Sequence, residues 1–175
     1  MKRTKKMTVS ALSCAVSIVI LLLGSLIQTV DLTVVAIASL VVVFVHIEIG
    51  APYNWLVWIC TSLLALLLLP SKSVGLEYAV FGGVYPILKD YLERIPRWLS
   101  RILKLVVFNA LLIAMIALTE FVLGIEFFGA ENIWIKAGLY LLMNFTFLIY
   151  DLLITRLVII YNLKYRERVE KFLKR

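Results

Sequence analysis

Residues 74–94 read VGLEYAVFGGVYPILKDYLER, and they decide how the chain folds because they are long enough to cross a membrane without being uniformly apolar. The stretch contains charged and helix-interrupting residues, namely Glu77, Gly82, Gly83, Pro86, Lys89 and Asp90. The segments around it are rich in Leu, Val and Ile. A span interrupted by Gly and Pro is tolerated in a bilayer where it lines a cavity or is buried in protein, so this stretch is predicted to border a binding site.

The composition is typical of an integral membrane protein. Hydrophobic residues make up 63% of the 175 positions, well above the roughly 45–50% found in soluble domains. Apolar runs close to the ~20 residues that cross a bilayer fill nearly the whole length. The chain therefore has no room for a soluble catalytic domain.

Turn and breaker residues divide the chain into six predicted membrane-spanning helices in a single all-α domain, residues 1–175. The sequence Gly50-Ala51-Pro52 and the turn that begins at Pro70 are the clearest boundaries. We expect the six helices at residues 7–27, 32–49, 53–69, 74–94, 102–123 and 133–161, followed by a basic cytoplasmic tail at residues 162–175.

The distribution of basic residues predicts the orientation, because short loops rich in Lys and Arg remain in the cytoplasm. With both termini in the cytoplasm, 16 of the 18 Lys and Arg residues lie on the inner side, and only Lys72 and Lys136 lie outside. The inner side then has a net charge of +10 and the outer side −3. The basic excess thus indicates membrane topology and contact with anionic lipid, and it does not indicate nucleic-acid binding.

Polar residues at helical spacing indicate a ligand site in the outer halves of the last three predicted helices. Lys136, Tyr140, Asn144 and Asp151 share one face of the sixth helix, and polar groups at membrane depth face the bundle interior or a cavity. An outer set of residues combines both signs of charge with aromatic rings, which suits a mostly apolar pocket for a small molecule. The predicted ligand-binding residues are Glu77, Tyr78, Tyr85, Glu120, Lys136, Tyr140 and Asn144. The alternative for the same residues is anchoring at the lipid headgroups.

A second group of charges, nearer the cytoplasm, is expected to be structural. Lys89 and Asp151 lie at similar depth and can neutralise each other, because an unpaired charge inside a membrane is costly. His46 and Glu48 are expected to form an interfacial hydrogen-bonded pair, since one imidazole and one carboxylate are too few ligands for a metal site.

Small residues on the first helix predict a close helix contact. Ala11 and Ala15 lie four residues apart, and Ser10, Cys14 and Ser17 lie beside them. One side of this helix therefore has little side-chain bulk, which allows another helix to approach closely. The contact can be with a partner protein or with another helix of the same bundle.

Catalysis is not indicated. The chain has no Ser/His/Asp set, no glycine loop for phosphate and no cluster of metal ligands. We expect a protein that is not an enzyme and that uses no cofactor or metal.

Residues 6–24, KMTVSALSCAVSIVILLLG, follow a basic start and resemble the first helix of the substrate-binding S component of energy-coupling factor (ECF) vitamin transporters. Ala11 and Ala15 match the Ala-x-x-x-Ala motif of that family, and the length, the six predicted helices and the cytoplasmic termini agree across essentially the whole chain. The resemblance implies a multi-pass protein of the bacterial cytoplasmic membrane that binds a vitamin or related micronutrient from the outer side. It also implies separate partners, a transmembrane coupling protein that contacts Ala11 and Ala15, and two ATPase subunits that supply the energy.

Two other functions remain open. Small six-helix proteins similar to the rod-shape protein MreD act as membrane scaffolds that bind other membrane proteins and no solute. An autonomous facilitator for a small solute would need a continuous polar path, which the mostly apolar second and third helices disfavour. No residue pattern in the chain identifies the solute.

Overall fold

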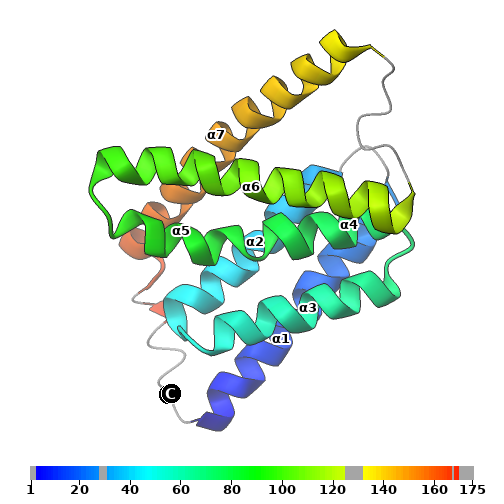
Figure 1. Cartoon of the computed structure of the whole chain (residues 1–175). Helices are drawn as coiled ribbons and strands as arrows, with labels where there is room; N and C mark the ends of the chain where they lie inside the picture. The colour runs from blue at the N-terminus through cyan, green and yellow to red at the C-terminus, as the bar shows by residue number, and fades with distance from the viewer. Residues whose placement is uncertain (1–2, 28–30, 125–131, 167, 170–175) are drawn as a thin grey trace.

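A computed structural model describes residues 3–27, 31–124, 132–166 and 168–169 (Figure 1). Every regular element in these residues is helical. The elements are α1 (Arg3–Ser25), α2 (Asp31–Glu48), α3 (Tyr53–Leu68), α4 (Lys72–Glu77), the π-helical turn η1 (Tyr78–Gly82), α5 (Tyr85–Glu93), α6 (Arg97–Leu123) and α7 (Ile133–Lys164). The all-α class predicted from the sequence is confirmed.

Four helices in the described part of the chain, α1, α2, α6 and α7, are long and apolar enough to cross a membrane. Helix α3 is apolar but has only 16 residues. The predicted fourth span is divided into α4, η1 and α5. A membrane protein with several spanning helices agrees with these lengths.

Helix α2 is the centre of the bundle, because it contacts α1, α3, α4, η1, α5 and α7. In Figure 1, α3, the run from α4 to α5, and α6 lie roughly parallel in front, and α1, α2 and α7 cross behind them. The α4–α5 run contacts α3 through α4 and η1, and it contacts α6 along its length. The interrupted stretch thus lies inside the bundle with neighbours on several sides.

Two apolar cores flank this stretch. The first joins α1, α2 and α3 and includes Leu21, Val42, Val57 and Tyr78. The second joins α5, α6 and α7 and is built from Tyr85, Phe108, Leu112, Phe147 and Ile154. Tyr78 and Tyr85, both fully buried, therefore belong to different cores although they are only seven residues apart.

The helix boundaries differ from the predicted ones mainly near proline. Helix α6 begins at Arg97, directly after Pro96, so residues 97–101, which the predicted boundaries leave between the fourth and fifth helices, are helical. This fits proline chemistry, since proline is compatible with a helix start and incompatible with its interior. The predicted break at Gly50-Ala51-Pro52 is confirmed, and Gly50 has a φ of +77°, which favours glycine.

Helix α7 is little buried at its start. It has 32 residues, which corresponds to about 48 Å. Its buried residues are Phe147, near the middle of the helix, and Ile154, whereas Ile133, Trp134 and Leu141 near its start are 73%, 82% and 69% exposed. The start of α7 extends beyond the rest of the bundle and diverges from α6 (Figure 1).

Candidate functional site

The interruption predicted in residues 74–94 is a π-helical turn. In η1, the Gly83 amide donates to the Tyr78 carbonyl across five residues, at 2.8 Å. The Ala79 carbonyl accepts a hydrogen bond from the Trp58 indole nitrogen of α3, at 2.9 Å. This side chain satisfies a carbonyl inside the irregular turn, where no water is available in a membrane. π-turns are frequent at functional sites.

The two glycines allow neighbouring helices to approach this turn closely. A Cβ atom on Gly82 would lie 2.4 Å from Val35 of α2, and one on Gly83 would lie 2.3 Å from the Trp58 ring. Both distances are too short for any side chain. The glycine pair therefore serves packing at η1.

An aromatic cluster lies next to η1 and consists of Phe81, Tyr85, Phe108, Phe147 and Tyr150. Phe108 and Phe147 stack with their ring centroids 4.2 Å apart, and Phe81 lies 5.4 Å from both Tyr85 and Tyr150. Offset and edge-on ring pairs of this kind add to the stability gained from burial. The cluster joins η1, α5, α6 and α7.

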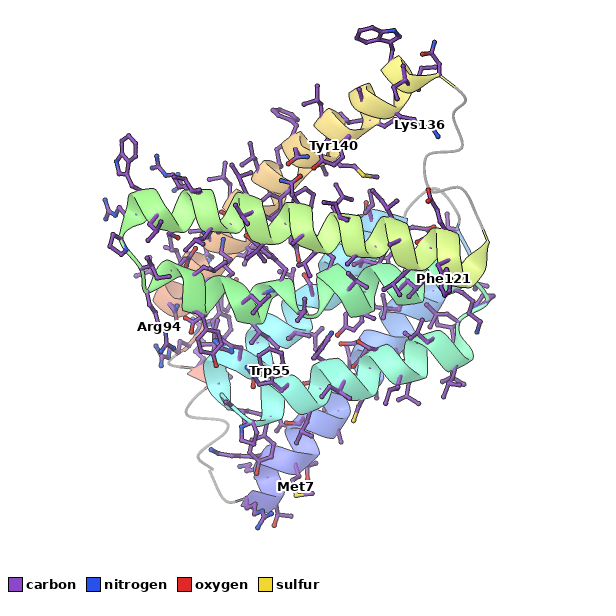
Figure 2. All side chains as sticks on the ribbon, viewed as in Figure 1. Met7, Trp55, Arg94, Phe121, Lys136 and Tyr140 are labelled. Carbon is purple, nitrogen blue, oxygen red and sulfur yellow. The ribbon has the colours of Figure 1, made fainter. Side chains whose placement is uncertain are left out.

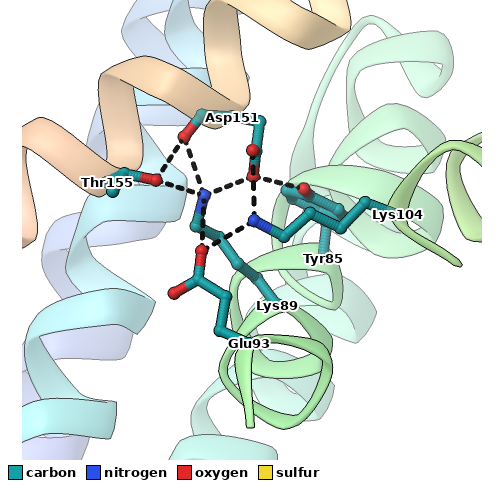
Figure 3. Close-up of polar contacts among 6 residues, drawn as sticks. All are labelled: Tyr85, Lys89, Glu93, Lys104, Asp151 and Thr155. Carbon is teal, nitrogen blue, oxygen red and sulfur yellow. Dashed lines mark hydrogen bonds and ion pairs between the residues drawn. The ribbon is translucent and has the colours of Figure 1, made fainter. Parts of the chain in front are cut away.

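On one side of the aromatic cluster lies an ion cluster of Lys89, Glu93, Lys104 and Asp151 (Figure 3). Lys89 pairs with the Asp151 carboxylate and also donates to the Asp151 carbonyl at 2.7 Å. Lys104 Nζ lies 2.7 Å from Glu93 Oε1 and 3.1 Å from Asp151 Oδ2. Two positive and two negative groups therefore balance, which is the arrangement that limits the cost of charge in a bundle interior.

Two hydroxyl groups complete the coordination of this cluster. The Tyr85 hydroxyl donates to Asp151 Oδ1 at 2.6 Å, and Lys89 donates to Thr155 Oγ1 at 2.7 Å. The side chain of Lys89 is only 5% exposed, whereas that of Glu93 is 42% exposed. The cluster is thus buried at Lys89 and open to the surroundings at Glu93. The predicted neutralisation of Lys89 by Asp151 is confirmed.

On the other side of the aromatic cluster lies an amide cluster of Asn109, Tyr140 and Asn144. The Asn109 amide donates to Asn144 Oδ1 at 3.0 Å, and the Tyr140 hydroxyl donates to Asn109 Oδ1. The Asn144 amide donates to the Tyr140 carbonyl at 3.0 Å. All three side chains are half-buried. Polar groups of α6 and α7 therefore satisfy one another where the two helices begin to diverge.

The seven predicted ligand-binding residues do not form one pocket. Tyr140 and Asn144 belong to the amide cluster. Lys136 is half-buried and lies one helical turn before Tyr140, and Figure 2 labels the side chains of Lys136 and Tyr140 on α7. Glu120 is exposed near the end of α6, which has diverged from α7 at that level. Glu120 lies eleven residues, or three helical turns, after Asn109 on α6, and α7 has moved away from α6 over that distance.

The remaining three predicted residues lie elsewhere. Tyr78 is buried in the first core, on the side of α1 and α3. Tyr85 faces the second core and donates to Asp151 in the ion cluster. Glu77 is half-buried, and its Oε2 atom has no hydrogen-bond partner among the described residues. The π-turn lies between Tyr78 and Tyr85, and the two side chains belong to different cores.

The first helix uses its small residues on two faces. Ser10, Ser13 and Ser17 are buried in the bundle, whereas Ala11 and Ala15 are exposed. Internal packing therefore involves the serines, and the two alanines are exposed on the surface of the bundle.

His46 and Glu48 do not pair with each other, so that prediction is wrong. His46 Nδ1 lies 2.7 Å from the Asn54 amide nitrogen, and its Nε2 lies 3.3 Å from Asp90. Glu48 accepts a hydrogen bond from the Tyr161 hydroxyl at 2.8 Å. The two residues are two positions apart on α2, and their side chains point to different neighbours. His46 points towards α3 and α5, and Glu48 points towards α7.

Sequence reasoning missed Lys104, Glu93 and Trp58. Lys104 is one of the basic residues that indicate the inner side, and its position inside an apolar helix is the signal for a buried partner. Trp58 was one aromatic residue among several in an apolar helix, and no local pattern indicates that its indole would bond to Ala79.

Comparison with known proteins adds no assignment. The chain gave no match to a protein-family model, to a curated protein or to a solved structure. What the protein does must therefore be argued from the three clusters along α7.

Proposed function

We propose that this protein is a membrane-embedded binding subunit for the uptake of a small solute, of the kind expected for a vitamin or related micronutrient. The observation that carries the proposal is the order of groups along one face of α7. The amide cluster comes first, the aromatic cluster follows, and the ion cluster comes last. Polar side chains that face a bundle interior and an interrupted helix beside them both point to a solute site in membrane proteins. In the proposed function, the aromatic cluster separates the amide cluster from the ion cluster and keeps the solute from crossing freely.

The proposed topology has six crossings with both termini in the cytoplasm. The run from residue 72 to residue 93 covers 22 residues, or about 33 Å if helical throughout, which matches a hydrocarbon core of about 30 Å. This orientation puts the ion cluster near the cytoplasm and the amide cluster towards the outside. Labelling of single cysteines introduced at Lys5 and Lys72, in a background with Cys14 and Cys60 replaced by Ser, tests it. A membrane-impermeant reagent should label position 72 in intact cells and position 5 only after lysis.

The proposed ligand site is the amide cluster with Lys136 beside it. Its amide and phenol groups now bond to one another, and they can exchange those bonds for bonds to a polar solute with little loss. Lys136 and the diverging α6 and α7 provide the outer approach. The proposed site therefore has four residues in place of the seven predicted from the sequence. They are Asn109, Lys136, Tyr140 and Asn144.

Transport would need partners, because no nucleotide-binding motif occurs in the sequence. We place the contact with an ECF-type coupling protein at Ala11 and Ala15, and the energy in separate ATPase subunits. The exposure of both alanines supports this placement. Substitution of either alanine by Trp should reduce co-purification with the coupling protein and leave solute binding unchanged.

The experiment that tests the binding function is mass spectrometry of small molecules released from the purified protein, followed by titration of whatever is found. Asn144→Leu should weaken binding by ~1–3 kcal/mol, or about 5- to 150-fold, because it removes hydrogen-bonding groups from a buried site. Leu141→Ala, on the exposed face of α7, is the matched control and should bind normally. Equal affinities for the two variants, or no released molecule at all, would overturn the proposal.

A scaffold function is the second candidate, and the uncovered start of α7 favours it. Ile133, Trp134 and Leu141 present a continuous apolar surface that extends beyond the bundle. A partner helix could cover it, as in MreD-like scaffolds. Photo-crosslinking from position 141 separates the two functions, since a scaffold should crosslink to a membrane protein at high yield whether or not a solute is bound.

A further inference from the structure

A groove lies between α2 and the end of α7, apart from the three clusters. Its volume is about 220 Å³, below the roughly 300–1,000 Å³ typical of pockets for small molecules. All nine lining side chains are aliphatic or aromatic, and only the tyrosines Tyr161 and Tyr165 have a polar atom. Such a groove suits a flexible hydrocarbon chain better than a polar solute.

The aromatic wall of the groove is fixed in place. Phe44 and Tyr161 meet edge to face with their centroids 6.1 Å apart. The Tyr161 hydroxyl donates to Glu48, so this polar atom is already satisfied within the protein. The groove is therefore preformed and leaves the Tyr161 ring free for apolar contact.

One end of the groove has an excess of positive charge. Lys164 Nζ lies 5.8 Å from the centroid of Tyr165, which lines the groove. Arg166 follows directly and donates to Asn162 at 3.5 Å. Both basic side chains are exposed. Lysine and arginine at this level attract anionic headgroups by ~1 kcal/mol each.

We infer that this groove binds one acyl chain of an anionic phospholipid, whose headgroup is held by Lys164 and Arg166. The apolar lining selects a hydrocarbon chain, and the two cations select a negative headgroup. The inference is independent of the proposed solute site, because it uses other residues at the other end of α7.

The test uses the full-length protein in detergent, mixed with phosphatidylglycerol or with phosphatidylcholine of the same acyl chains, and native mass spectrometry to count bound lipids. We expect one phosphatidylglycerol per chain and at least tenfold weaker binding of phosphatidylcholine, from two cations at ~1 kcal/mol each. Substitution of both Lys164 and Arg166 by Gln should abolish this preference. Arg156→Gln, an exposed cation on the same helix, is the matched control.

Filling the groove tests the acyl-chain contact. Leu157→Trp and Ile160→Trp both place an indole at lining positions that are 37% and 50% exposed, so at least one of them should fold. Either should abolish binding of the single lipid, whereas Leu141→Trp should not. Lipid binding that is unchanged in both groove variants, equal binding of the two lipids, or a protein found in place of the lipid would overturn the inference.

Discussion

Replacement of Asp151 by Leu should destabilise the protein more than any other single change in the ion cluster. It leaves Lys89, whose side chain is 5% exposed, and Lys104 to share Glu93, two positive charges against one negative. Removing one partner of a buried ion pair costs roughly 3–5 kcal/mol. The protein has 175 residues, and for this size each kcal/mol lowers the melting temperature by roughly 2–4 °C, so the loss should be about 6–20 °C.

The converse change should be milder. In Lys89→Met, Asp151 keeps the Tyr85 hydroxyl at 2.6 Å and Lys104 at 3.1 Å. The double variant Lys89→Met with Asp151→Leu removes the charge imbalance of the Asp151 variant, so it should be more stable than Asp151→Leu alone. Such recovery is typical when an apolar pair replaces a buried ion pair.

The assay is unfolding of purified protein in mixed micelles, followed by circular dichroism and by tryptophan fluorescence. Arg94→Gln is the control, because Arg94 pairs with Asp90 at an exposed site, and it should leave the melting temperature nearly unchanged. If Asp151→Leu melts within about 2 °C of the wild type, or if the two single effects simply add in the double variant, the ion cluster does not stabilise the bundle as argued.

Two further changes test the π-turn with the same assay. Gly83→Ala should destabilise the protein by ~1–3 kcal/mol, because the new methyl group clashes with Trp58. Gly138→Ala is the control, since no atom lies within 4 Å of its new methyl group, and it should be neutral or stabilise the protein by up to ~1 kcal/mol. Equal effects of the two variants would show that η1 is not closely packed. Trp58→Phe should lower the free energy of unfolding by ~1–3 kcal/mol, because the Ala79 carbonyl loses its hydrogen-bond donor. Trp98→Phe, at an 85% exposed position, is the control and should change this free energy little. Equal losses in the two variants would show that the bond from the Trp58 indole to Ala79 is unimportant.

Local sequence signals predicted the elements well. Breakers at Gly50 and Pro70 separate helices in the structure, and the glycine pair with Pro86 correctly marked an irregular span. The pairing of Lys89 with Asp151 was predictable because a buried charge needs a partner at the same depth. Both inferences need only the position of a residue along its own helix, which gives its depth in the membrane.

The ligand site was not predictable in the same way, because it depends on how helices cross. One π-turn between Tyr78 and Tyr85 directs them into different cores. Helix α7 diverges from α6, and Glu120 near the end of α6 is exposed and apart from the amide cluster. The small face of α1 had two possible uses, and only packing shows that the serines lie inside and the alanines outside.

The ion cluster also sets an order of events during biosynthesis. Lys89 and Lys104 are made before Asp151, which follows Lys89 by 62 residues. Until α7 is inserted, the nascent chain carries two cations and only Glu93 to neutralise them. Helix α7 is therefore the one that completes the charge balance, and we expect a chain that ends after α6 to be less stable in the membrane and to be degraded. The level of this truncated chain in the membrane fraction should be lower than that of the full chain, and Lys89→Met in the truncated chain should raise it.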